Sequence, residues 1–160
     1  MQYLSTRDSS LKESFSTILF QGLSKDGGLF LPRTWPSIDI EQLKNKSYQE
    51  ISFEVIFPFV QENIREDDLK IILDKTFQNF NHPQIAPLVN IDNNKFILEL
   101  FYGPTLSFKD YAMQFLGNVF SHVLESSNKS LTIIGATSGD TGSAAIEAFK
   151  GKKNINVFIL

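Results

Sequence analysis

One stretch of the chain, residues 99–110, combines residue types that can do covalent chemistry. It starts as an apolar, strand-like run, is broken by Gly103-Pro104 and continues as an amphipathic helix. Ser107 and Asp110 have the spacing of an acidic capping box, which predicts a helix start at Ser107 with Lys109 near its second position. The positive helix end disfavours a charged lysine, and a nucleophilic lysine must be uncharged. Lys109 is therefore a candidate nucleophile, although a solvated lysine or a pair with Asp110 would give the same pattern.

A second stretch, residues 135–142, is a glycine-rich loop between a short apolar run and a helix. Thr137, Ser138 and Thr141 offer hydroxyl donors, and the helix start offers free N–H groups. The loop lacks the P-loop lysine and the dinucleotide fingerprint, which argues against nucleoside triphosphates and NAD. Ligands of α/β sheets bind where strands end, as this loop does. We expect it to bind a small carboxylate or phosphate; the alternative is a tight turn with Asp140 or Thr141 capping the helix.

The composition excludes several other classes of function. The chain has 160 residues, of which 42% are hydrophobic and 21% charged, as in ordinary globular proteins. Its net charge of −3 gives no general attraction to nucleic acid or to anionic membranes. It has no cysteine, and His82 and His122 lie far apart, so we expect no metal site. No signal or membrane-spanning pattern is visible, and the expected compartment is the cytoplasm.

Apolar periodicity predicts an α/β chain with two parts. Residues 1–84 are expected to form an α-rich domain, and residues 85–160 the first, incomplete part of a parallel α/β domain. In the first part we expect an extended start, a helix opened by Ser10 and Glu13 and ended by Gly22, an extended segment at 29–32, a short helix at 38–45 and a buried helix from Ser47 to about Val60 with Pro58 near its end. A further helix is expected from Glu66, with Leu69, Ile72, Leu73 and Phe77 on its apolar face, followed by a hairpin around 92–94. The second part continues with a βαβ unit over 131–160, whose first strand should be buried, after a helix that follows Ser107 and has a buried stripe of Phe108, Tyr111, Ala112, Phe115, Leu116, Val119, Phe120, Val123 and Leu124.

Several motifs of the chain together resemble one enzyme family. The resemblance covers essentially the whole sequence and is to the threonine synthases, which are fold-type II pyridoxal-phosphate enzymes with the tryptophan-synthase-β-like fold. It rests on Glu99-Leu100-Phe101-Tyr102-Gly103-Pro104-Thr105, Phe108-Lys109-Asp110, Gly135-Ala136-Thr137-Ser138-Gly139-Asp140-Thr141-Gly142, and, near the start, Tyr3-Leu4-Ser5-Thr6-Arg7, Gly22-Leu23 and Asp26-Gly27-Gly28-Leu29.

This resemblance implies an activity and a set of site residues. The family converts O-phosphohomoserine and water into threonine and phosphate. Lys109 would form the Schiff base with pyridoxal phosphate and transfer protons, with Phe108 beside the cofactor. Two departures are visible, because Tyr102 stands where the family often has histidine and Asp8 where glycine is common. The residues implied to hold the substrate's carboxylate are Thr137, Ser138, Gly139, Asp140 and Thr141.

The length of the chain sets a further expectation. Threonine synthases have several hundred residues, and in the family the loop around the cofactor's phosphate and the group facing its ring nitrogen lie further on. We therefore expect an N-terminal fragment that is inactive alone and can self-associate through its exposed C-terminal strand. Two alternatives stay open. One is another fold-type II enzyme, such as a threonine dehydratase, and the other is a stand-alone, non-catalytic binding or assembly module.

Overall fold

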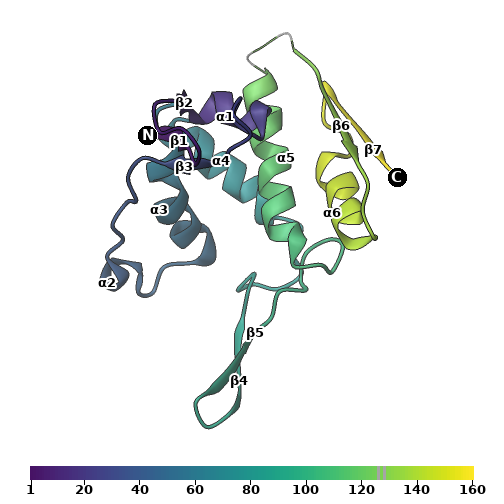
Figure 1. The fold of residues 1–160 in the computed structure, drawn as a ribbon. Coiled ribbons are helices and arrows are strands. Elements are labelled where there is room, and N and C mark those ends of the chain that lie inside the picture. The colour runs from purple at the N-terminus through teal and green to yellow at the C-terminus, as the bar shows by residue number, and fades with distance from the viewer. Residues whose placement is uncertain (126, 128) are drawn as a thin grey trace. The chain divides into compact units, whose positions relative to one another are not determined.

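The computed structural model describes residues 1–125, 127 and 129–160 and has mixed α/β secondary structure (Figure 1). No helix within these residues is long and apolar enough to cross a membrane. In chain order the elements are β1 (Gln2–Ser5), β2 (Lys12–Ser14), α1 (Phe15–Gln21), β3 (Phe30–Pro32), α2 (Ile40–Leu43), α3 (Tyr48–Val60), α4 (Glu66–Phe77), β4 (Leu88–Asp92), β5 (Lys95–Leu98), α5 (Lys109–Glu125), β6 (Leu131–Gly135), α6 (Asp140–Phe149) and β7 (Ile155–Ile159).

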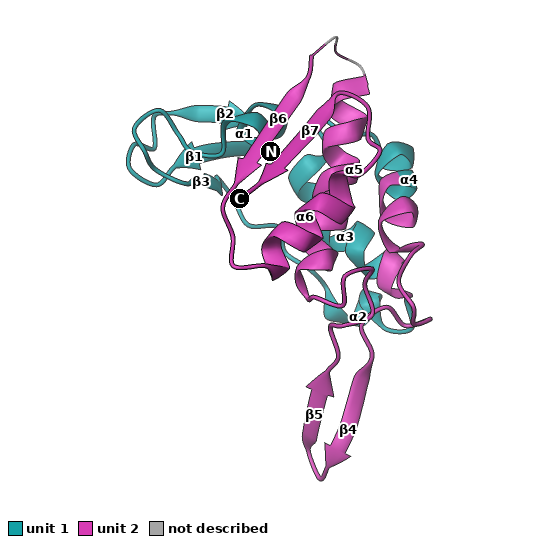
Figure 2. Ribbon diagram, turned by 90° about the vertical axis from the view of Figure 1, so that its right-hand side faces the viewer, with its two compact units in different colours: residues 1–46, 50–71 teal, residues 47–49, 72–160 magenta. Residues whose placement is uncertain are grey.

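The chain divides into two compact units (Figure 2). Unit 1 comprises Met1–Lys46 and Glu50–Ile71, and unit 2 comprises Ser47–Gln49 and Ile72–Leu160. Helix α4 thus contributes residues to both units. The expected boundary between a domain of residues 1–84 and one of residues 85–160 stays a prediction.

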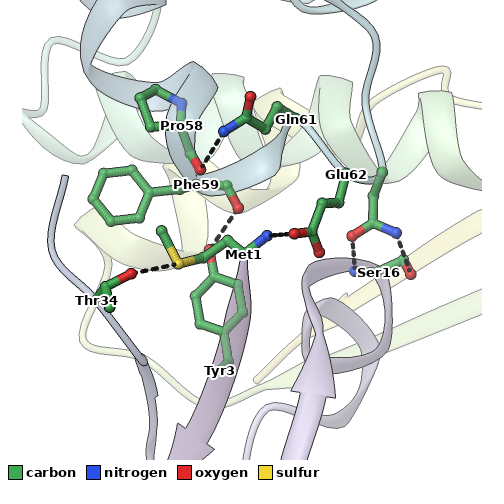
Figure 3. A network of polar contacts seen from close by, with 9 residues as sticks. Met1, Tyr3, Ser16, Thr34, Pro58, Phe59, Gln61 and Glu62 are labelled. Atoms are coloured by element: carbon green, nitrogen blue, oxygen red, sulfur yellow. Dashed lines mark hydrogen bonds and ion pairs between the residues drawn. The ribbon is translucent and has the colours of Figure 1, made fainter.

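Unit 1 contains a three-stranded antiparallel sheet in the order β2-β1-β3. Its first strand is anchored to the end of α3 (Figure 3). The Tyr3 hydroxyl donates a hydrogen bond of 2.8 Å to the Phe59 carbonyl, and the N-terminal ammonium of Met1 pairs with Glu62. Burial, and secondarily the charge of Glu62, raises the pKa of the Tyr3 phenol. These contacts hold the sheet against the helix within unit 1.

The first helix begins later than its capping pattern suggested, and the prediction of a start at Ser10 is wrong. Residues of β2 pair with β1 instead, and Ser14 caps α1 by accepting a bond of 3.3 Å from the Thr17 amide. A non-local strand pairing therefore replaces the first expected turn of the helix. The predicted end is confirmed, because Gly22 adopts a φ of 69° and its amide donates to the Ile18 carbonyl.

Helices α3 and α4 differ in how well their burial follows the sequence pattern. The predicted start of α4 at Glu66 and its apolar face are confirmed. The expectation that α3 is buried is wrong, because Val60 is its only residue in the buried class among those described. Pro58 lies inside α3, which ends two residues later, as predicted. The buried apolar residues of α4 are Leu69, Ile72, Leu73 and Phe77.

Unit 2 contains both predicted β structures. Strands β4 and β5 form an antiparallel hairpin whose turn includes Asn94 at a φ of 59°, and all their residues are exposed. Strands β6 and β7 pair in parallel and are connected by α6, which confirms the βαβ unit. The expectation of a buried first strand is wrong, because Ile134 of β6 is 72% exposed. Phe158 of β7 is exposed as well, and the expected self-association through this strand stays a prediction.

Helix α5 buries a polar row that the apolar pattern did not predict. Val119, Phe120 and Leu124 are buried as expected. Phe108, placed in the same predicted stripe, is exposed, and Ala112 is exposed as well. The buried face instead includes the polar residues Asp110, Gln114 and Asn118.

Asn118 belongs to a chain of buried hydrogen bonds. The Lys152 ammonium donates to Asn118 Oδ1 over 2.7 Å, and Asn118 Nδ2 donates to Thr76 Oγ1 over 3.2 Å. The Thr76 hydroxyl donates in turn to the Ile72 carbonyl. Burial lowers the pKa of Lys152, and nearby Lys75 adds to this effect. The chain links α4, α5 and the turn after α6, which satisfies polar groups that would otherwise be costly to bury.

An aromatic cluster in unit 2 packs α5 against the segment that follows α4. The Tyr111 ring meets Phe80 with a centroid separation of 4.7 Å and Tyr48 with one of 6.2 Å. Its hydroxyl donates a bond of 2.6 Å to the Ile85 carbonyl. Burial raises the pKa of Tyr111 to about 12. These contacts of Tyr111 hold the first turns of α5 against Phe80, Tyr48 and the Ile85 backbone.

Helices α5 and α6 approach closely at Gly117. A Cβ atom on this glycine would lie 2.5 Å from the Ala148 carbonyl oxygen, a separation that real contacts do not show. Both views of the ribbon show the N-terminal ends of α5 and α6 at the same end of the pair (Figures 1 and 2). The contact therefore brings two helix N-termini to one side of unit 2.

We predict that Gly117→Ala destabilises the protein. In a helix interior alanine is favoured over glycine by about 1 kcal/mol, but here the added methyl must push α6 away, at a cost of about 1–3 kcal/mol. Denaturant unfolding followed by circular dichroism measures the difference. Ala112→Gly, at an exposed position of the same helix, serves as the control and should lose about 1 kcal/mol from propensity alone. An increase in the unfolding midpoint for Gly117→Ala would contradict the packing described here.

Candidate functional site

The loop before Lys109 is a tight turn with an unusual backbone conformation. The Leu106 amide donates to the Gly103 carbonyl over 3.1 Å. Leu106 has a φ of 62°, a region that branched residues rarely occupy, and its side chain is 68% exposed. Ser107 Oγ accepts a bond of 3.3 Å from the Lys109 amide, so the predicted capping role of Ser107 is confirmed. Lys109 is thus held by its backbone in the first turn of α5.

Asp110 does not complete the predicted capping box. Its side chain is fully buried and accepts two hydrogen bonds from Thr105, one of 2.7 Å from the amide and one of 2.6 Å from the hydroxyl. The carboxylate therefore points back to the turn and not to the Ser107 amide. No ion pair joins Asp110 to Lys109 in the described residues, which removes the alternative that Asp110 simply pairs with this lysine.

The Lys109 ammonium lies against an aromatic ring. Its Nζ atom is 4.5 Å from the centroid of the Phe108 ring, a cation–π contact. Phe108 is 62% exposed, and Lys109 is half-buried. Within the part of the chain that the structure describes, no carboxylate forms an ion pair with this amine. In the described residues, the Phe108 ring and not a carboxylate is therefore the recorded contact of this amine.

The glycine-rich loop runs from the end of β6 to the start of α6 and is organised by Thr137. Thr137 Oγ1 accepts hydrogen bonds from the Gly142 amide at 3.0 Å and from the Gly139 amide at 3.3 Å. Gly139 occupies the cap position with a φ of 138°, where a side chain would be strained, and no side chain caps the helix there. A Cβ atom on Gly142 would lie 2.7 Å from Thr137 Oγ1, so both glycines are needed for this loop.

The hydrogen bonds to Thr137 leave some amides at the start of α6 without an acceptor in the described residues. The alternative in which Asp140 or Thr141 caps α6 is wrong, because Thr137 supplies the side-chain acceptor. In the described residues no acceptor contacts the amides of Asp140 and Thr141. Ser138, Gly139 and Asp140 are exposed. Free amides at a helix N-terminus can bind an anionic group.

The two candidate segments lie at the N-terminal ends of the packed helices α5 and α6 (Figures 1 and 2). Lys109 and Phe108 lie at the N-terminal end of α5, and the loop at residues 137–141 precedes and opens α6. Because both helices start at the same end of the packed pair, an amine and free amides share one side of unit 2 (Figures 1 and 2). Among the described residues, no three acidic or histidine side chains gather as a metal site would require.

The polar contacts of Tyr102, which lies next to the turn at residues 103–106, were not predicted from the sequence. The Tyr102 hydroxyl donates to Glu99 over 2.7 Å, and the Tyr102 ring lies 4.7 Å from that of His82. The hydrogen bond to Glu99 raises the pKa of Tyr102. The Asn81 amide also donates to the Tyr102 carbonyl. Only the resemblance had singled out Tyr102, as a departure, because the contact with His82 joins positions twenty residues apart along the chain.

Comparisons with known proteins cover both the sequence and the fold. Residues 2–77 match the family model described as "Threonine synthase N terminus". The chain is 45% identical to threonine synthase of Schizosaccharomyces pombe and 43% identical to that of Pseudomonas aeruginosa, and each alignment covers 100% of this chain. It spans only about a third of these relatives, 34% and 35% of their lengths.

Solved structures give the same result. The crystal structure titled as PLP-bound threonine synthase from Brucella melitensis superposes with a TM-score of 0.95 at 45% identity, over 99% of this chain and 35% of that one. Yeast threonine synthase superposes with a TM-score of 0.90 at 42% identity, again over 99% of this chain and 35% of the other. By sequence and by fold, the chain matches the N-terminal portion of threonine synthases.

Proposed function

We propose that the protein carrying this chain is a pyridoxal-phosphate-dependent threonine synthase, which converts O-phosphohomoserine and water into threonine and phosphate. The observation that carries the proposal is that Lys109 opens α5 and the free amides open α6, two packed helices that start at the same end (Figures 1 and 2). The family match supports the reaction, and the PLP-bound relative supports the cofactor. We place Lys109 and Phe108 at the cofactor and residues 137–141 at the substrate.

The residues of the chain fit an aldehyde cofactor. Covalent attachment needs an amine that is not held in an ion pair, and among the described residues Lys109 meets this condition within the candidate site. The exposed Phe108 ring offers a flat apolar surface beside that amine. When bound, pyridoxal phosphate supplies the electron withdrawal that stabilises negative charge on a substrate carbon.

The chain's own residues then have separate tasks. Lys109 is the residue that would hold the cofactor's aldehyde, and its amine would accept and return protons. The Phe108 ring limits the access of water to that amine on one side. At the other segment, the free amides of Asp140 and Thr141 and the Ser138 hydroxyl bind the substrate's carboxylate, which orients its amino group toward Lys109. Thr137 and Gly139 keep the loop in the required shape.

We predict that pyridoxal phosphate attaches preferentially to Lys109, one of twelve lysines in the chain. Borohydride reduction fixes the cofactor to the amine that holds it, and peptide mass spectrometry then locates it. Lys109 should be modified at cofactor concentrations at least about tenfold below those needed for the other lysines, because an oriented neighbouring ring and helix start favour this site.

Lys153→Ala provides the matched control, because Lys153 is exposed and lies in the same unit. It should leave the modification of Lys109 unchanged, whereas Lys109→Ala should leave only the weak, unselective modification of other lysines. Equal modification of all lysines in the unaltered chain would contradict the assignment of Lys109.

A second prediction concerns the reaction. The 160-residue chain alone should release no phosphate from O-phosphohomoserine, since the family resemblance places groups that hold the cofactor further along. A protein of family length that carries this chain should release phosphate and form threonine in equal amounts. A coupled phosphate assay and amino-acid analysis measure both products. Formation of oxobutanoate from threonine, without phosphate release, would instead indicate a dehydratase.

A further inference from the structure

We propose that Asp110 is a positioning residue for Lys109: its buried carboxylate clamps the turn at residues 103–106 and thereby fixes the lysine for its attachment to the cofactor. The inference rests on the proposed function, because it assigns Asp110 a task toward the amine proposed to bind the cofactor. Asp110 touches neither cofactor nor substrate in this account and acts through Thr105 and the turn.

The Asp110 carboxylate lies in a fully buried environment. Asp110 is 0% exposed and is the only charged side chain in the buried class among the described residues. Each of its oxygens accepts one hydrogen bond from Thr105, Oδ2 from the amide and Oδ1 from the hydroxyl. A buried carboxylate is costly unless donors satisfy it, and such charge-assisted bonds are the strong ones. This pair is therefore a rigid connection between the helix and the turn.

The turn at residues 103–106 packs closely against Asp110. A Cβ atom on Gly103 would lie 2.5 Å from both Cβ and Oδ2 of Asp110, so the carboxylate packs directly on the backbone of that glycine. Leu106 holds its positive φ although its exposed side chain makes it free to relax. A strained backbone persists only where its surroundings impose it. The bonds from Thr105 to Asp110 supply that restraint.

The turn at residues 103–106 is connected to Lys109 through Ser107 and Phe108. The turn leads directly into Ser107, whose hydroxyl accepts from the Lys109 amide, and into Phe108, whose ring lies under the Lys109 amine. A relaxed turn would move both contacts. Loss of the clamp should therefore displace the amine while leaving the later turns of α5 packed through Val119 and Leu124.

Three variants test the inference in the 160-residue chain. Asp110→Asn keeps the shape and both contacts but removes the charge, because its oxygen can accept from the Thr105 amide while its N–H group donates to the Thr105 hydroxyl. Thr105→Val keeps the shape and removes only the hydroxyl donor, and it keeps the test possible if Asp110→Asn does not fold. Thr105→Ser retains both donors and is the rescue control. Two readouts are taken, the rate of reducible attachment of pyridoxal phosphate at Lys109 and the hydrogen exchange of the segment around Thr105.

The expected result is a roughly tenfold lower rate of attachment at Lys109 for Asp110→Asn, since two charge-assisted bonds become weaker neutral ones, with faster exchange in residues 103–108. Thr105→Val, which loses one of the two bonds, should show a similar loss, and Thr105→Ser a rate near that of the unaltered chain. Faster exchange with an unchanged rate at Lys109 would overturn the positioning role alone. No preference for Lys109 in the unaltered chain would contradict the proposed function itself, and the inference with it.

Discussion

The close contact between α5 and α6 at Gly117 is the constraint on which the candidate site depends. With no side chain on this residue, the helix backbone reaches the Ala148 carbonyl. The two helices start at the same end of the packed pair (Figures 1 and 2). In the proposed site, Lys109 supplies an amine from one helix start and residues 137–141 supply free amides from the other. Neither segment alone would form a site for a ligand with both a carbonyl carbon and an anionic group.

Buried polar groups hold this arrangement in register. Asp110 connects the first turn of α5 to the preceding loop, and Asn118 connects its middle to Lys152 and Thr76. Such groups contribute little net free energy of folding, because the free-energy cost of removing them from water offsets much of the stabilisation from their hydrogen bonds. Their geometry is specific, however, because a shifted helix would leave them unsatisfied. This part of the structure is therefore better suited to fixing positions than an apolar surface would be.

The elements set by local pattern could be predicted from the sequence. The apolar face of α4, the hairpin of β4 and β5, the βαβ unit and the capping of α5 by Ser107 all follow from neighbouring residues. The failures involve contacts that short-range patterns do not carry. The pairing of β2 with β1 displaced a capping signal at Ser10, and the Thr105 donors drew Asp110 away from its expected role. At the site, the residue types were visible from the sequence, but their shared position required the helix contact.

The most direct test of the account is a crystal structure of a protein that carries this chain, with pyridoxal phosphate and an unreactive analogue of O-phosphohomoserine. We expect continuous density between Lys109 Nζ and the aldehyde carbon before the analogue is added. It also predicts that the analogue's carboxylate lies on the amides of Asp140 and Thr141. Attachment of the cofactor to another lysine, or a carboxylate bound away from residues 137–141, would contradict the claim that the two helix starts form one site.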